Sequence, residues 1–175
     1  MTDAAPRARR LQIAVSAPGD ADPAVMALAE AVGREIAQRG CVLVCGGLGG
    51  GMRASCAGAK AAGGTTIGII PGYEATAANE HLDHVISTGM GQARNTLVAA
   101  SGDAMVAVGG GLGTLSEIAL ALRLNRPVVA LGGWAPMLAT PEARAMLAGL
   151  PGRLSLADSP QDAVREAVRL AAGAG

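Results

Sequence analysis

The sequence has very few aromatic residues: no phenylalanine, one tyrosine (Tyr73) and one tryptophan (Trp134) among 175 residues. Proteins that bind single-stranded nucleic acid stack the bases on aromatic side chains, and this chain has no set of aromatics that could do so. It also has no excess of positive charge, because 14 basic residues balance 14 acidic ones. A general nucleic-acid binder carries a basic surface. We therefore expect no nucleic-acid partner.

Cysteine and histidine are also scarce, with three and two residues. The cysteines, Cys41, Cys45 and Cys56, lack the paired spacing of a zinc site, and no helical pattern places His81 and His84 on one face. We therefore expect no metal site. Two cysteines four residues apart on one strand are too distant to bridge, so we expect reduced, buried thiols.

The sequence has no apolar stretch long enough to span a membrane, and its basic N-terminus is not followed by the apolar core of a secretory signal. These absences predict a cytoplasmic protein with no membrane partner. Residues 1–10 are expected to be a flexible N-terminal segment and residues 11–175 a single domain. A chain of this length buries roughly two thirds of its surface on folding, so it needs no disulfides.

Short apolar runs alternate with longer amphipathic segments along the chain. The apolar runs predict strands at residues 11–16, 41–45, 65–70, 84–88, 104–108 and 127–131. Helices are predicted from Asp22 to near Gly40 and over residues 52–62, 90–101 and 114–125, with further helix starts at Thr140-Pro141 and Ser159-Pro160. Continuously apolar strands separated by helices indicate a parallel sheet covered on both faces. The predicted fold class is therefore α/β, a doubly wound, mostly parallel, Rossmann-like sheet.

Two glycine clusters, GGLGGG (46–51) and GGGLG (109–113), each follow a predicted strand and lead into a predicted helix. In sheets of this type, ligands bind where the carboxyl ends of the strands meet, so both loops can face one site. Glycine lets the backbone approach an anion, and the helix N-terminus offers free N–H groups. Neither loop fits the Walker A or the G-x-G-x-x-G pattern. The loops predict a site for phosphate or sulfate; alternatively, the glycines only form tight turns.

Four motifs occur in the order GGLGGGM, TIGIIPG, TGMGQARN and GGGLGTLSEIALAL. Together they resemble the Rossmann-like superfamily that contains the Lonely Guy (LOG) cytokinin-activating phosphoribohydrolases, the proteins long misnamed lysine decarboxylases, and the molybdenum-cofactor carrier proteins. The resemblance covers about residues 11–131. It is closest in motif to the carriers, because Gly109 and Asn95 replace a proline and a lysine of the hydrolase motifs.

The glycine loops and the resemblance together give a set of candidate binding residues: Gly46, Gly47, Gly49, Gly50, Arg94, Asn95, Gly110, Gly111, Gly113 and Thr114. Of these, the resemblance implies Arg94, Gly110, Gly111, Gly113 and Thr114. In a hydrolase, Glu117 would stabilise the developing oxocarbenium ion or activate water, and Arg94 would anchor the substrate. Each residue also has a plainer interpretation. Thr114 and Glu117 match a capping box, which would serve only the helix start. Gln92 and Asn95 fit either a polar lining or a solvated helix face. A cation such as Arg94 is unfavourable in the first turn of a helix, which favours a functional role.

Three functions compete at this point. The first is a carrier or binding protein for a small phosphorylated ligand, either the molybdenum cofactor or a nucleoside monophosphate, with no tightly required cofactor of its own. The second is a phosphoribohydrolase that releases free base and ribose 5-phosphate from nucleoside 5′-monophosphates. The third, a DNA-processing role by analogy with the DNA-uptake protein A family, is disfavoured by the charge balance and the scarce aromatics. The apolar surface of helix 114–125 and the resemblance also predict a homodimer or homotetramer.

Overall fold

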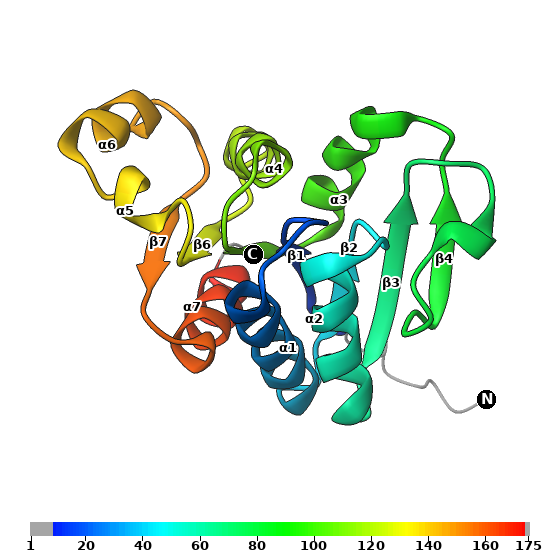
Figure 1. The fold of residues 1–175 in the computed structure, drawn as a ribbon. Helices are drawn as coiled ribbons and strands as arrows, with labels where there is room; N and C mark the ends of the chain where they lie inside the picture. Colours follow the sequence, from blue (N-terminus) through cyan, green and yellow to red (C-terminus); the bar gives the residue numbers. More distant parts are fainter. Residues whose placement is uncertain (1–8, 174–175) are drawn as a thin grey trace, which may run out of the picture.

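The computed structural model describes residues 9–173, which form a seven-stranded sheet in the order β4-β3-β2-β1-β5-β6-β7 (Figure 1). Every neighbouring pair of strands is parallel. The strands are β1 (Gln12–Ser16), β2 (Val42–Cys45), β3 (Thr65–Ile70), β4 (His84–Ser87), β5 (Ala104–Val108), β6 (Val128–Leu131) and β7 (Leu154–Ala157). The predicted doubly wound parallel sheet is confirmed.

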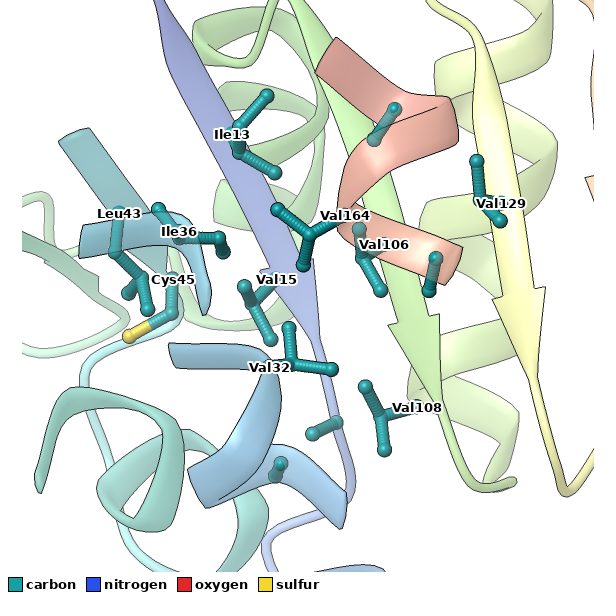
Figure 2. Packing of buried hydrophobic residues seen from close by; sticks show 14 of the residues in the cluster. Ile13, Val15, Val32, Ile36, Leu43, Cys45, Val106, Val108, Val129 and Val164 are labelled. Carbon is teal, nitrogen blue, oxygen red and sulfur yellow. The ribbon is translucent and has the colours of Figure 1, made fainter. Parts of the chain in front are cut away.

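Helices cover both faces of this sheet. They are α1 (Pro23–Gln38), α2 (Gly50–Ala61), α3 (Asn95–Ser101), α4 (Leu112–Arg123), α5 (Ala135–Leu138), α6 (Pro141–Leu147) and α7 (Pro160–Ala172), with short 3-10 helices η1 (Ala75–Ala77) and η2 (Gly91–Arg94). One apolar cluster joins α1, α2 and α7 to the sheet, and Figure 2 shows Val32 and Val164 packed beside Val15 of β1. A second cluster joins α3, α4 and α5 to the opposite face. β1 and β5 contribute side chains to both clusters.

Helices α1 and α2 touch backbone to backbone. A Cβ at Gly33 of α1 would lie 1.8 Å from the carbonyl oxygen of Ser55, and one at Gly58 of α2 would lie 1.9 Å from that of Glu30. No side chain fits at either position, so the two glycines allow the helices to cross closely. This crossing sets the position of α2, and therefore of the glycine loop that precedes it.

The predicted helix starts are confirmed at three positions. The side chains of Asp22, Thr140 and Ser159 each accept a hydrogen bond from a backbone N–H in the first turn, and each is followed by proline. Three predicted helices were wrong in extent: the segment over 90–101 divides into η2 and α3, and α2 and α4 each begin two residues earlier than expected. The short elements α5 and β7 were not predicted.

The N-terminal segment predicted to be flexible lies mostly outside the described residues, as do residues 174–175 of the predicted domain. Of that segment, Arg9 and Arg10 are described. The Arg9 guanidinium donates to Asp103 at 2.6 Å, and that of Arg10 donates to Thr65 Oγ1 at 3.3 Å. Among the helices of residues 9–173, none is long and apolar enough to cross a membrane.

Candidate ligand-binding site

A cleft of about 410 Å³ lies at the edge of the sheet where β1, β2 and β5 end. Four segments line it, from the loops after β1 and β2, from η2 and α3, and from the start of α4. The lining residues are Ala17, Pro18, Gly19, Asp20, Leu48, Met52, Gln92, Arg94, Asn95, Gly111, Leu112, Gly113, Thr114 and Glu117. Both glycine loops therefore contribute to one cleft.

Polar side chains are concentrated at the base of this cleft. Arg94, at the end of η2, is only 5% exposed. Its Nη1 lies 3.6 Å from Glu117 Oε1 and donates to the side-chain oxygen of Asn95. Its Nη2 donates to the carbonyl oxygen of Gly46 at 3.3 Å. The guanidinium thus links the loop after β2 to the helix that follows β5.

Glu117 is also buried, and its second carboxylate oxygen accepts a hydrogen bond from the hydroxyl of Ser16, the last residue of β1. Burial raises the pKa of Glu117 above its ordinary value of 4.5, although the Ser16 hydroxyl and the Arg94 charge act in the opposite direction. The carboxyl therefore takes up a proton at a higher pH than an exposed glutamate does.

One donor of the cluster has no partner. Within the described part of the chain, the buried Arg94 Nε has no hydrogen-bond acceptor. An unsatisfied buried donor costs about 1–3 kcal/mol, and more when the group is charged. Native structures seldom retain such a group without a reason. Arg94 lines the cleft, so a small movement of its side chain would let a ligand oxygen there accept from Nε.

The N-terminus of α4 lies beside this arginine. Its N-cap is Gly111, which offers no side-chain cap, and the first turn contains no acidic residue. The capping-box interpretation is therefore wrong: Thr114 lies within the first turn, and Glu117 bonds to Ser16 instead of capping the helix. The free N–H groups and the positive end of the helix dipole favour an anion here.

The loop that leads into α4 is held by the loop that follows β6. Trp134 Nε1 donates to the carbonyl oxygen of Gly111 at 2.9 Å, and the Trp134 backbone N–H donates to that of Gly109 at 3.4 Å. A Cβ at Gly133 would lie 1.9 Å from the carbonyl carbon of Gly109, so the loops are pressed together. These contacts fix the orientation of the α4 N-terminus.

The structure places six of the predicted site residues along the cleft: Arg94, Asn95, Gly111, Gly113, Thr114 and Glu117. The other glycines support the loops without lining it. Gly46 lies under Arg94, and Gly47 packs against Gly68 and Ile70 of β3. Gly50 turns at a φ of 58° next to the Gly19 carbonyl, whereas Gly49 has no close neighbour. Gly110 contacts Gly133 and Trp134.

Sequence reasoning missed Ser16, Asp20 and Trp134. A signal existed for the first two, because Ser16 is a polar residue that ends an apolar strand, and the Pro18–Asp20 segment follows at the same edge of the sheet. No signal indicated Trp134, whose contact depends on how two distant loops meet.

Other parts of the described chain are weaker candidates for a binding site. A larger cavity of about 600 Å³ lies beside α6 and β7, but it is lined mainly by leucines, and its Arg144 is exposed. His81 lies in a loop, and His84 begins β4. Residues 9–173 contain no group of three or more His, Cys, Asp or Glu side chains that could hold a metal ion.

Comparison with known proteins identifies the family and several similar structures. The sequence profile of the SLOG cluster4 family matches residues 10–164. A protein of Archaeoglobus fulgidus is 45% identical over 121 residues, which cover 69% of this chain and 80% of that protein. The structure is similar to the molybdenum cofactor binding protein of Rippkaea orientalis, with a TM-score of 0.85, 35% identity, and coverage of 93% of this chain and 98% of that one. The molybdenum cofactor carrier protein of Chlamydomonas reinhardtii gives a TM-score of 0.81, 37% identity, and coverage of 94% and 99%. The resemblance identified from the glycine motifs is confirmed.

Proposed function

The chain belongs to the SLOG cluster4 family, and from this premise we propose that it is a carrier for a phosphate-bearing cofactor, with the molybdenum cofactor as the cargo. The observation that carries the proposal is the unsatisfied, buried Nε of Arg94 beside the uncapped N-terminus of α4. Two structural relatives described by their molybdenum cofactor binding or carrier role support the choice of cargo.

In this proposal the phosphate binds to the N–H groups of residues 111–114, and Arg94 donates to one of its oxygens. The rest of the ligand extends along the side of the cleft formed by Leu48 and Met52. Glycine at positions 111 and 113 leaves the backbone accessible, because a Cβ at 111 would meet only Pro18 and one at 113 would meet nothing. The cleft volume of about 410 Å³ lies within the range of small-molecule sites.

A phosphoribohydrolase is the second candidate, because Glu117 is a buried carboxylate that lines the cleft. In that role the carboxylate must face the sugar of a nucleotide. Here both of its oxygens are engaged, one by the Ser16 hydroxyl and one by the Arg94 guanidinium. These contacts favour a supporting role for Glu117 and therefore a carrier.

Two measurements test the proposal. Mass spectrometry of small molecules released from the purified protein should identify a phosphorylated pterin cofactor. Incubation with AMP should release no adenine, even at high protein concentration. Rapid adenine release that disappears in Glu117→Gln would overturn the carrier and establish the hydrolase.

We further propose that the protein acts in the cytoplasm as a homodimer or homotetramer. Leu97 on α3 and Leu124 at the end of α4 are 37% and 42% exposed, which is a large exposure for apolar side chains on neighbouring helices. Burial of such side chains against a second copy would remove apolar surface from water.

A further inference from the structure

Two cysteines form a close pair beneath the first glycine loop. The Sγ atoms of Cys45 and Cys56 lie 3.4 Å apart, and both side chains are fully buried. Cys45 ends β2 and Cys56 lies in α2, so the pair flanks the loop of residues 46–49 and the start of α2. Figure 2 shows Cys45 among the apolar side chains of the core. Cys41, the third cysteine, bonds instead to the carbonyl of Arg39.

Polar groups surround the two sulfurs. The backbone N–H of Gly47 donates to Cys45 Sγ at 3.3 Å, and Asn79 Nδ2 lies 3.9 Å from Cys56 Sγ. The same amide donates to the carbonyl oxygens of Gly47 and Leu48 at 3.2 and 3.1 Å. The hydrogen bond between the two sulfurs lowers the pKa of Cys56, although burial opposes this shift. A lowered pKa favours the thiolate, which is the nucleophilic form of cysteine.

We infer that Cys45 and Cys56 are an oxidation site at which a hydroperoxide closes a reversible disulfide. The sulfurs need to approach from 3.4 Å to about 2.05 Å, which is a small movement for two side chains. Neither side chain is exposed, so the peroxide reaches the pair during local opening of the loop.

The chemistry balances in two steps. The Cys56 thiolate attacks one oxygen of the hydroperoxide, the O–O bond breaks, and the departing oxygen takes a proton to leave as an alcohol, or as water from hydrogen peroxide. The sulfur of Cys45 then attacks the resulting sulfenic sulfur, and the S–O bond breaks as water leaves with the thiol proton. Two thiols and one hydroperoxide thereby give one disulfide, one alcohol and one water.

The disulfide would connect the end of β2 to α2 across the first glycine loop. Leu48 of this loop lines the cleft, and its carbonyl is held by Asn79, which also contacts Cys56. The oxidation state of the pair thus controls the mobility of one wall of the cleft. This regulatory consequence rests on the proposed carrier function, whereas the oxidation chemistry does not.

The test begins with the reduced protein, which is treated with hydrogen peroxide, digested with trypsin without reduction, and mapped by mass spectrometry. We expect two of the three thiols to be lost, with a cross-link between peptides 40–53 and 54–60. The first peptide contains both Cys41 and Cys45. The cross-link should therefore persist in Cys41→Ser, the matched control, and disappear in Cys45→Ser. Should Cys45→Ser fail to fold, mapping of Cys41→Ser alone decides the result.

The exposed Met146 serves as an internal control for the oxidant, since it is 76% exposed. Three free thiols in protein whose Met146 is oxidised would overturn the inference. So would oxygen adducts on the cysteines without a cross-link, or a cross-link that survives in Cys45→Ser. Titration of the reduced and the cross-linked protein with sulfate separates the two proposals. If the cross-link forms but neither the reduced nor the cross-linked protein binds sulfate, the proposed function is contradicted and the oxidation site still stands.

Discussion

Arg94 is the residue on which the site depends most directly. Its guanidinium contacts Gly46, Asn95 and Glu117, and still has one unsatisfied donor. The sequence predicted a functional role for Arg94, because an arginine near a helix start opposes the helix dipole. The partner of Glu117 could not be predicted. The Thr114-x-x-Glu117 spacing fits a capping box equally well, and the Ser16 hydroxyl that excludes it lies 101 residues away in the sequence.

Replacement of Arg94 by alanine should weaken sulfate binding roughly ten- to a hundredfold. This range corresponds to the loss of one charge-assisted hydrogen bond, about 1.5–3 kcal/mol. Isothermal titration calorimetry measures the change directly. Arg53→Ala is the matched control, because Arg53 is exposed and pairs with Glu80 outside the cleft. Equal affinities in the two variants would contradict the role of Arg94.

The raised pKa of Glu117 predicts that sulfate affinity increases as the pH falls, and that the increase begins at a higher pH than the titration of an ordinary glutamate would give. Protonation removes the negative charge that competes for Arg94, while sulfate keeps its double charge over this range. Affinity measured at several pH values should show this slope in the wild type and a flat profile in Glu117→Gln. Asp20 also lines the cleft, so Asp20→Asn is the control. A slope that survives in Glu117→Gln and disappears in Asp20→Asn would assign the effect to Asp20.

At the scale of secondary-structure elements, the strands were predicted more accurately than the helix ends. The observed bounds of β3 and β5 are the predicted ones. Buried parallel strands are continuous apolar runs, and such runs are easy to delimit when they are rich in β-branched residues or end at a glycine. β7 was missed because LSLA has no β-branched residue and is only half-buried at the sheet edge. The segment over 90–101 changes from the 3-10 helix η2 to α3 between Arg94 and Asn95, and hydrophobic periodicity does not predict this change.

The α1–α2 crossing predicts that Gly58→Ala destabilises the protein, although alanine is the better helix former by about 1 kcal/mol. The added Cβ would lie 1.9 Å from the Glu30 carbonyl oxygen, so the helices must separate. We expect the free energy of unfolding to fall by about 1–3 kcal/mol, as measured by urea unfolding. Gly149→Ala is the control, because a Cβ there meets no atom within 4 Å. An unchanged or higher midpoint in Gly58→Ala would show that the helices do not cross this closely.

The loop held by Trp134 provides a spectroscopic prediction. Trp134 is the only tryptophan, and its indole bonds to the N-cap of α4. Sulfate binding should therefore change the intrinsic fluorescence of the wild type, and Arg94→Ala should need roughly ten- to a hundredfold more sulfate for the same change. Trp134→Phe, which keeps an aromatic ring but lacks the N–H donor, should bind sulfate several-fold more weakly. Wild-type affinity in Trp134→Phe would limit the residue to a packing role.

At the scale of the whole molecule, the parallel topology of the sheet could be predicted from the sequence. The oligomeric state is a separate property, which the topology of one chain does not determine. The alternation of strands and helices indicated a sheet covered on both faces, and the resemblance indicated self-association. Self-association stays a prediction, and the exposed apolar residues on α3 and α4 are the surface at which it can be tested.

Self-association predicts a mass in solution of at least twice the 17.2 kDa chain at micromolar concentration. Multi-angle light scattering measures it. Leu97→Asp should shift the protein towards the monomer, because a buried, unpaired charge is costly at an interface. Met146→Asp is a control at an exposed apolar residue that lies on α6 and not on α3 or α4. A monomeric wild type would refute the proposal.

The contacts at the base of the cleft join residues far apart in the sequence, 48 residues between Gly46 and Arg94 and 101 between Ser16 and Glu117. No fragment of the chain can hold this arrangement, so a ligand that needs it binds the folded state and not the unfolded one. Such a ligand, at a hundred times its dissociation constant, adds about 2.7 kcal/mol to the free energy of unfolding. For the proposed carrier we therefore expect the loaded protein to be degraded more slowly than the empty one, so that the supply of cargo would set the lifetime of the protein.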